Sequence, residues 1–248
     1  MKKWLMGAIA VTLSTSAVAQ TDRTLQLENV FDLEYAASPT LHPSGDYGVF
    51  VRQSMDIKHD QKTGRLWTVK PNGDIRPLTG DSAHEWSPVW SPDGKRLAFI
   101  SDASGSPQIT IYWTDTGKHA VISELTQTPS SLSWSPNGEY IAFSQFTPIK
   151  SAAPVSLPGK PEGADWTAPP QFVDKDNYRY DGGGYVSDGY QQIYVLSAEG
   201  GTARQITDDE YNNGGALEWS ADGKQIYFSA NRRSDAFRQP MNSEIYAV

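Results

Sequence analysis

WSPDGKRLAFIS, residues 90–101, decides the fold because similar segments occur three more times in the chain. These segments are LHPSGDYGVFV from Leu41, WSPNGEYIAFSQ from Trp134 and WSADGKQIYFSA from Trp219, and all of them align without gaps. They start 49, 44 and 85 residues apart, and the last interval fits one repeat plus an insertion. A repeat of about 40 to 50 residues is typical of a β-propeller, in which each blade is a four-stranded sheet.

Each copy has the chemistry of a tight turn followed by a strand. Pro92 presets φ at the second turn position, the Asp93 side chain can cap the turn, and Gly94 takes the positive φ that ends it. The run from Leu97 to Ile100 is apolar at consecutive positions, as expected of a strand buried on both faces. Blades that stack face to face bury their strands in this way. An ordinary β-sandwich is the alternative, and four gapless copies of one turn argue against it.

A second pattern completes each repeat. Residues 65–79, 108–123 and 192–207 each contain an aromatic-rich strand, a glycine-containing turn and a short strand, which predicts the outer hairpin of a blade. The chain is therefore predicted to be all-β, a β-propeller of four-stranded blades. The predicted division is a signal peptide (1–19), an N-terminal lead-in (20–40) and a partial propeller (41–248), with blades at about 41–81, 90–125, 134–208 and 219–248.

The last repeat stops early. It reaches Ser243–Val248, which matches the opening of the outer hairpin at 192–195, and there the sequence ends. About three blades and part of a fourth are thus visible, whereas propellers usually close with four to eight blades. We therefore expect an incomplete propeller, a fragment of a longer protein. Because an unfinished blade leaves apolar faces and open strand edges, we also expect self-association through those edges.

The N-terminus has the pattern of a secretory signal peptide. Lys2 and Lys3 precede an apolar run from Leu5 to Leu13 and an Ala17-Val18-Ala19 cleavage site. The run is too short to span a bilayer, which takes about 20 apolar residues. The expected location is periplasmic or secreted, with no membrane anchor after cleavage. The chain has no cysteine for disulfides or a lipid anchor, and its net charge of −8 argues against nucleic acid as a partner.

No catalytic residue, metal site or cofactor site is predicted. The GxSxG nucleophile elbow of an α/β-hydrolase does not occur. The histidines His42, His59, His84 and His119 lack the paired spacing of a zinc site, and His42 replaces the serine of a WSPDG-like turn. Asp115-Thr116-Gly117 resembles an aspartic-protease triplet, but it joins two strands of an outer hairpin, where Asp and Gly are ordinary turn residues. The repeat tryptophans precede each turn at a fixed place, which predicts packing between blades.

The WSPDGKRLAF repeat resembles the propeller repeat of the TolB family and of the N-terminal domains of prolyl-oligopeptidase-type serine peptidases. The stretch YRYDGGGY at 178–185 is similar to one in bacterial dipeptidyl aminopeptidases and acylaminoacyl peptidases. Those enzymes carry a Ser-Asp-His triad on a C-terminal α/β-hydrolase domain, which has no counterpart in this sequence. The resemblance implies the non-catalytic propeller of an exported serine exopeptidase, which gates peptide access. A TolB-like periplasmic protein-binding propeller is the alternative, and a sensor or polysaccharide-binding propeller is a third.

The insertion at 146–190 contains the candidate site residues. Six prolines lie in its first half, and its second half is rich in Tyr, Asp and Gly. Long excursions of this kind are usually functional loops or disordered segments, and the aromatic content favours an ordered loop. The candidates for substrate access are Tyr178, Arg179, Tyr180, Asp181 and Trp166. Arg179 can hold a peptide carboxylate with two hydrogen bonds, and tyrosines can pack along an extended peptide. Alternatively, Arg179 and Asp181 pair with each other and only fix the loop.

Overall fold

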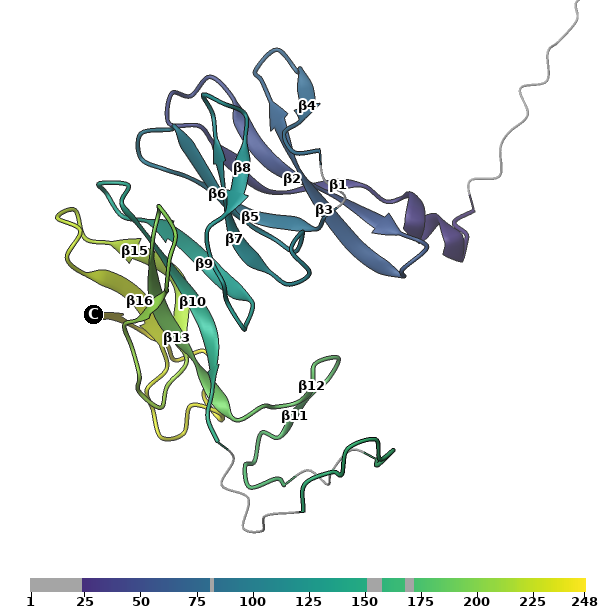
Figure 1. The fold of residues 1–248 in the computed structure, drawn as a ribbon, viewed down its shortest axis with the longest axis vertical. Helices are drawn as coiled ribbons and strands as arrows, with labels where there is room; N and C mark the ends of the chain where they lie inside the picture. Colours follow the sequence, from purple (N-terminus) through teal and green to yellow (C-terminus); the bar gives the residue numbers. More distant parts are fainter. Residues whose placement is uncertain (1–23, 81–82, 151–157, 168–171) are drawn as a thin grey trace, which may run out of the picture.

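The computed structural model describes residues 24–80, 83–150, 158–167 and 172–248. Within these residues the one helix is the 3-10 helix η1 (Leu27–Asp32). Four antiparallel sheets are arranged as a four-bladed β-propeller, and a fifth sheet of two short strands lies in the insertion (Figure 1). The predicted all-β propeller is therefore confirmed. The predicted signal peptide at 1–19 and Asp81, the last residue of the predicted first blade, lie outside the described residues.

Each sheet is built from strands in their sequence order. The first sheet contains β1 (Tyr35–Leu41), β2 (Gly48–Asp56), β3 (Gln61–Val69) and β4 (Ile75–Pro77). The second contains β5 (Glu85–Trp90), β6 (Arg96–Ser101), β7 (Gln108–Trp113) and β8 (His119–Val121). The third contains β9 (Pro129–Trp134), β10 (Tyr140–Pro148), β13 (Gly189–Ser197) and β14 (Arg204–Gln205). The fourth contains β15 (Asn213–Trp219), β16 (Ile226–Ala230) and β17 (Glu244–Ala247).

The turn between the first two strands of a sheet is closed by a serine side chain. Ser91 donates from Oγ to Asp93 Oδ1 at 2.6 Å and accepts the backbone N–H of Arg96 at 2.9 Å. Ser135 and Ser220 make the same bonds in the third and fourth sheets. The Ser91 hydroxyl is also the main reason why the pKa of the Asp93 carboxyl lies below its usual value. The repeated WSPDG signal is thus a set of local hydrogen bonds.

His42 replaces this serine in the first sheet and also reaches the second. Its Nδ1 accepts the backbone N–H of Ser44 at 3.1 Å, which confirms the predicted turn role. Its Nε2 lies 2.9 Å from the carbonyl oxygen of Gly94. Because a carbonyl only accepts, Nε2 carries the proton. Arg96 repeats this bond between sheets, donating from Nη2 to the carbonyl oxygen of Gly138 at 2.6 Å.

The repeat tryptophans join neighbouring sheets, as predicted. Trp134 donates from Nε1 to the carbonyl oxygen of Val89 at 3.1 Å, and Trp219 donates to the carbonyl oxygen of Ser133 at 3.2 Å. Each indole therefore bonds the innermost strand of the preceding sheet. Trp90 differs, because its ring packs edge-on against His42 and Tyr47, with centroids 4.7 and 5.7 Å away.

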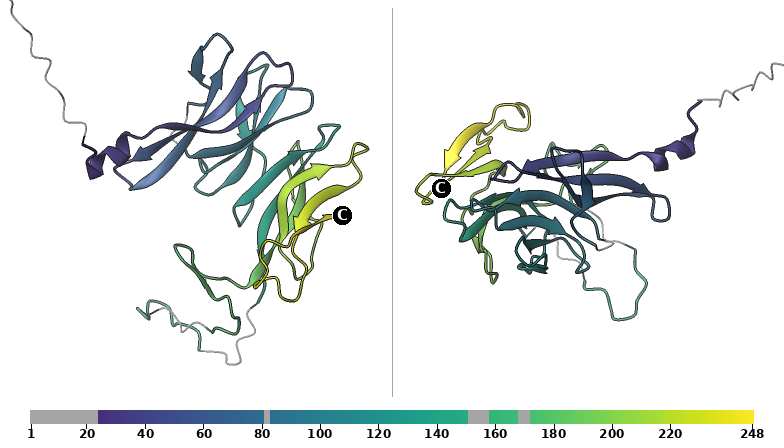
Figure 2. Two further views of the ribbon diagram at one scale, coloured as in Figure 1. Left: turned by 180° about the vertical axis from the view of Figure 1, so that it is seen from behind. Right: turned by 90° about the horizontal axis from the view of Figure 1, so that it is seen from above.

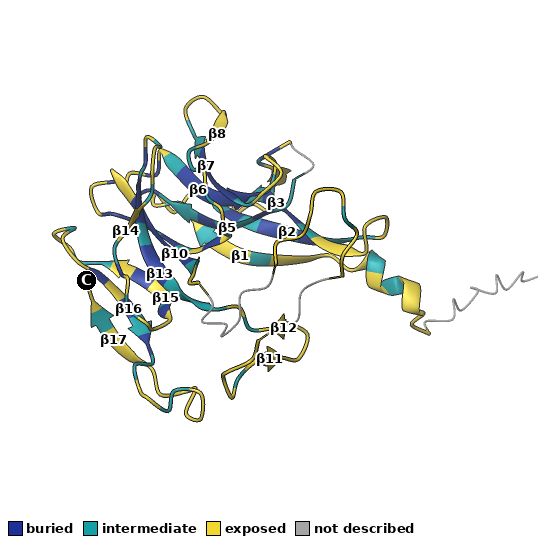
Figure 3. Cartoon of the chain, turned by 60° about the horizontal axis from the view of Figure 1, so that its bottom comes forward, coloured by how far each residue is buried: buried dark blue, intermediate teal, exposed yellow. Residues whose placement is uncertain are grey.

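Apolar clusters occupy the three junctions between consecutive sheets. At the first junction, Val49, Val51 and Leu66 pack against Leu97 and Phe99, all of them buried. The second and third junctions have equivalent clusters. Figure 3 shows the buried residues concentrated on the middle strands of the sheets. Full burial of such a side chain contributes about 1.5 to 3 kcal/mol, so these junctions supply most of the apolar stabilisation.

The innermost strands are bulged, which the sequence repeats did not indicate. Ser38, Ser87 and Ser131 have φ of 46°, 53° and 54°, in the left-handed region. At each bulge two residues oppose a single phenylalanine of the second strand. The opposing residues are Phe50, Phe99 and Phe143. A left-handed residue with a side chain costs about 1 to 2 kcal/mol, so the surrounding packing must hold these serines in place.

Two boundaries differ from the prediction. The predicted lead-in at 20–40 contains most of β1, which pairs with β2 as the innermost strand of the first sheet. The strand was missed because Ser38-Pro39 breaks the alternating pattern and Pro argues against a paired strand. The insertion begins after Pro148 and ends before Gly189, instead of covering 146–190, because β10 and β13 pair over their full length up to these two residues.

The contact between His42 and Gly94 can be tested against a matched glycine. Gly45 and Gly94 occupy the same turn position with φ of +79° and +69°, but a Cβ on Gly94 would lie 2.6 Å from His42 Nε2, whereas one on Gly45 meets nothing within 4 Å. We expect Gly45→Ala to lower the free energy of unfolding by about 1 kcal/mol through backbone strain. Gly94→Ala should cost about 1 to 2 kcal/mol more because it displaces the His42 bond.

Urea unfolding of both variants, alone and combined with His42→Ala, measures the difference. In the His42→Ala background the two glycine substitutions should lower the free energy of unfolding by the same amount, because the clash with the His42 ring is gone. If the two substitutions lower it equally in the wild-type background as well, the contact between His42 and Gly94 does not stabilise the protein.

Candidate functional site

Four of the five predicted site residues lie on one hairpin of the insertion. Strands β11 (Arg179–Tyr180) and β12 (Gly184–Tyr185) pair through Arg179 with Tyr185 and through Tyr180 with Gly184. The turn between them is closed by the N–H of Gly183 on the carbonyl oxygen of Tyr180 at 3.2 Å. Both views in Figure 2 show the insertion projecting from the body of the propeller. The hairpin is therefore a separate two-stranded sheet within the connection between β10 and β13.

The side chains of this hairpin contact one another. The Arg179 guanidinium lies 5.9 Å from the centre of the Tyr185 ring, and the Tyr178 and Tyr185 rings are 6.3 Å apart. Among the ion pairs of the described residues, none joins Arg179 to Asp181, which is exposed in the turn. Arg179 thus rests on an aromatic ring with its hydrogen-bonding edge available.

A cleft of about 750 Å³ separates the insertion from the segment 231–243, which follows β16. Tyr180 is the one predicted site residue that lines it. Opposite Tyr180 lie Asp235, Phe237 and Arg238 of the segment 231–243. In Figure 1 the two walls lie at the same end of the propeller. The cleft therefore combines aromatic and charged groups from two parts of the chain.

Two ion pairs involve the insertion wall, one within it and one that reaches the opposite wall. Lys175 Nζ lies 2.7 Å from Asp188 Oδ1, and this hydrogen bond raises the pKa of Lys175 above its usual value. The pair is therefore complete at neutral pH and is lost only as the pH rises through that raised pKa. Arg238 Nη2 reaches across to Asp176 Oδ2 at 3.5 Å, between two exposed side chains. An exposed pair of this kind contributes little, so the cleft is free to widen.

The opposite wall is anchored in the propeller by Arg232. Its Nη2 lies 2.7 Å from Asp209 Oδ2, and its guanidinium lies 4.2 Å from the centre of the Tyr246 ring. Asp209 also accepts the side-chain N–H of Asn213 at 2.6 Å. The segment 231–243 therefore starts from a fixed point at the junction of the third and fourth sheets.

A second cavity, of about 710 Å³, lies where the four sheets meet. It is lined by the bulged first strands, among them Ser87, Ser131 and Gly215, and by Pro43 and Pro92 of the adjoining turns. Trp166, the fifth predicted residue, is half exposed and lines neither this cavity nor the cleft. The structure therefore does not bring Trp166 together with the other four candidates.

Sequence reasoning missed the residues on the far side of the cleft. Asp235, Phe237 and Arg238 carry no motif, and Phe237 is notable only for being 55% exposed. Among the described residues, no cluster of three His, Cys, Asp or Glu side chains is arranged to hold a metal ion. No helix in the same part of the chain is long and apolar enough to cross a membrane.

Comparison with known proteins supports the resemblance found in the repeats. Residues 164–248 match the family described as "Dipeptidyl peptidase IV (DPP IV) N-terminal region". The chain is 29% identical to the uncharacterized peptidase YuxL of Bacillus subtilis over 196 residues, which is 78% of this chain and 29% of the relative. It is 33% identical to dipeptidyl-peptidase 5 of Porphyromonas gingivalis over 106 residues, covering 42% of this chain and 15% of the relative. The similarity to peptidases of this group is therefore confirmed.

Two further comparisons concern TolB and the fold. The chain is 27% identical to the Tol-Pal system protein TolB of Alcanivorax borkumensis over 119 residues, covering 45% of this chain and 27% of the relative. The solved acylaminoacyl peptidase of Pyrococcus horikoshii superposes with a TM-score of 0.64 at 16% identity, covering 88% of this chain and 31% of that one. At that identity the superposition establishes the fold alone. The chain spans less than a third of the length of each of these proteins.

Proposed function

We propose that this chain is the non-catalytic propeller part of an exported serine exopeptidase and that it gates the access of peptides to an active site on another domain. The observation that carries the proposal is the extent of the family match. Residues 164–248 include the hairpin β11–β12 and the whole segment 231–243, so both walls of the cleft belong to the matched region. No catalytic residue in this chain takes part.

The chemistry of the cleft suits an extended peptide of varied sequence. Tyr180 and Phe237 offer aromatic surface to apolar side chains, since both are more than half exposed. Arg179 lies on the same hairpin but does not line the cleft, so its N–H groups can reach a peptide carboxylate or carbonyl only where the peptide extends beyond the cleft. The lining is mixed in charge, with three carboxylates and two cations: Asp174, Asp176, Asp235, Lys175 and Arg238. The exposed ion pair allows the walls to separate around a bound chain.

Export is part of the proposal. It rests on the basic residues Lys2 and Lys3, the apolar run from Leu5 to Leu13 and the cleavage site at 17–19. The proposed location is the periplasm or the exterior of the cell.

A TolB-like propeller that binds another protein is the second candidate. The 27% identity to TolB of Alcanivorax borkumensis over 119 residues favours it. The two candidates differ in the ligand, which is an extended peptide in the first and a folded protein in the second.

We also propose that the chain associates with itself through its outermost sheets. Leu41 on the first sheet and Ile245 on the fourth are 66% and 81% exposed. A hollow of about 420 Å³ beside Leu41 is lined mostly by apolar atoms of Pro39, Val49 and Val69. Apolar surface of this kind favours association in water.

Peptide binding tests the gating proposal directly. A fluorescein-labelled, unstructured decapeptide should bind the purified chain saturably in fluorescence anisotropy. Tyr180→Ala should weaken binding about fivefold or more, because it removes an aromatic contact worth about 1 kcal/mol. Tyr227→Ala is the matched control, since Tyr227 is 39% exposed on the fourth sheet and lines none of the described cavities. A wild-type chain that does not bind the peptide would favour the TolB-like candidate.

The absence of a catalytic role predicts a second result. The purified chain should not hydrolyse dipeptidyl or acyl-aminoacyl chromogenic substrates, and a fluorophosphonate probe should label none of its serines. Ser44 Oγ lies 2.8 Å from His42 Nδ1, but the other nitrogen of this ring faces the carbonyl oxygen of Gly94, so no carboxylate completes a triad. Stoichiometric labelling of one serine would contradict the proposal.

Light scattering coupled to size-exclusion chromatography measures the proposed self-association. The wild-type chain should elute as oligomers whose mass rises with concentration. Leu41→Glu should shift it toward the monomer, because a carboxylate cannot be buried in the apolar hollow without a partner. Leu33→Glu is the control, since Leu33 is 54% exposed but follows η1, outside the sheets. A wild-type monomer at all concentrations would refute this proposal.

A further inference from the structure

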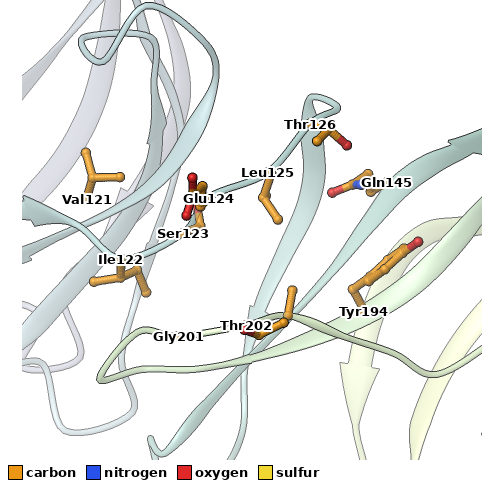
Figure 4. Close-up of a pocket in the computed structure, with 11 residues that line it drawn as sticks. Val121, Ile122, Ser123, Glu124, Leu125, Thr126, Gln145, Tyr194, Gly201 and Thr202 are labelled. Atoms are coloured by element: carbon orange, nitrogen blue, oxygen red, sulfur yellow. The ribbon is translucent and has the colours of Figure 1, made fainter.

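A cavity of a different kind lies between the second and third blades, and it shares no residue with the cleft. Its volume is about 560 Å³. One wall is the connection 121–126 after β8, the other is the turn 201–203 before β14, and Gln145 and Tyr194 form the floor (Figure 4). A cavity of this size can hold a small molecule.

The wall formed by 121–126 is fixed by the side chain of Gln108. Its Oε1 accepts the Ser123 hydroxyl at 2.7 Å and the N–H of Leu125 at 2.8 Å, while its Nε2 donates to the carbonyl oxygen of Leu125 at 3.0 Å. On the other side, Gly200 approaches the backbone of Ile122 so closely that a Cβ would lie 3.2 Å from the Ile122 oxygen. The cavity is therefore formed in advance of any ligand.

Gln145 provides an unused hydrogen-bond acceptor in this cavity. The residue is 7% exposed, and its amide oxygen is buried without a partner among the described residues. In Figure 4 the amide points across the cavity toward Leu125. Gln192, its partner in the β10–β13 pairing, differs because its oxygen accepts from Thr207 and Asn213. Burying an unpaired carbonyl is costly, so the cavity favours a molecule that donates to it.

The other side chains that line the cavity indicate the charge and polarity of the ligand that fits it. The Tyr194 hydroxyl is already bonded to Thr147 at 2.8 Å and Gln205 at 3.1 Å, so Tyr194 offers its ring. The lining contains one formally charged group, the exposed carboxylate of Glu124, and no Lys, Arg or His. A negatively charged ligand is therefore disfavoured, and one with N–H donors and a positive charge is favoured.

The blade fold itself does not require a glutamine at this position. The residue two places after the phenylalanine of the second strand is Arg52 in the first sheet, Ser101 in the second, Gln145 in the third and Ala230 in the fourth. The four blades therefore tolerate side chains of very different length and charge at this position.

We propose that the cavity between the second and third blades binds a small cationic amide, such as an amino-acid amide. The Gln145 amide turns to expose its buried Oε1, which then accepts an N–H of the ligand. The ammonium group of the ligand lies near Glu124, and its apolar side chain packs on Leu125 and Tyr194. This site is independent of the peptide-gating function, because the cleft and this cavity have separate linings.

Calorimetric titration with L-leucinamide tests the site on the intact chain. We expect saturable binding that weakens about tenfold or more in Gln145→Leu and about threefold or more in Glu124→Gln. N-acetyl-L-leucine, which has the same apolar group but an anionic charge, should bind at least about tenfold more weakly than leucinamide. Gln53→Leu is the matched control, since Gln53 is 6% exposed and has an equally unpartnered oxygen, but lies in the first sheet.

Several outcomes would overturn the proposal. One is that leucinamide does not bind saturably, another is that the two ligands bind equally well, and a third is that Gln145→Leu leaves the affinity unchanged. A fourth such outcome is loss of leucinamide binding in Tyr180→Ala, because it would place the ligand in the cleft. If Gln145→Leu does not unfold cooperatively, it has lost the native fold and its affinity says nothing about the site. The affinity of the exposed Glu124→Gln variant for leucinamide, and the wild-type preference for leucinamide over N-acetyl-L-leucine, then test the proposal. Peptide binding measured with the labelled decapeptide should be unaffected by either substitution, because neither residue lines the cleft, so failure of this site and failure of the gating function are distinguishable.

Discussion

Every other feature of this protein depends on the packing of one sheet against the next. A four-stranded sheet has two faces, and the consecutive apolar residues of strands such as β6 and β10 require both to be covered. Stacking the sheets satisfies that requirement and brings backbone carbonyls of one blade within reach of side chains from its neighbour. His42 and Arg96 bond the next turn, and Trp134 bonds the preceding strand. These directional bonds set the angle at which the apolar faces meet.

Stacking also determines where function can reside. The strands are fully occupied with pairing and packing, so binding groups lie on the connections between strands and in the gaps between sheets. The insertion at 149–188 leaves the third sheet between two strands that pair along nine residues, which gives it a rigid base. The segment 231–243 leaves the fourth sheet at the same end, held by Arg232. A cleft forms between them because adjacent blades place equivalent connections side by side.

The cleft and the cavity beside Gln145 are different kinds of site. The cleft is open, mixed in charge and bounded by an exposed ion pair, which suits ligands of variable sequence. The cavity is smaller, is preformed by Gln108 and Gly200, and has one unsatisfied acceptor in its lining, which suits a single small ligand. Their separation means that a small molecule can bind between the blades without blocking peptides at the rim.

The sequence by itself determined the all-β class, the Pro-Asp-Gly turns, the outer hairpins and the presence of a Tyr-rich insertion, because each is encoded within about a dozen consecutive residues by periodicity and turn chemistry. It did not reveal the bulged strand β1, since Ser38-Pro39 interrupts the pattern that identifies strands. Only the tertiary structure decided that Tyr180 faces Phe237 and Arg238 and that the Gln145 oxygen is left unpaired. Those facts depend on how blades stack, which brings together segments distant in sequence that share no local signal.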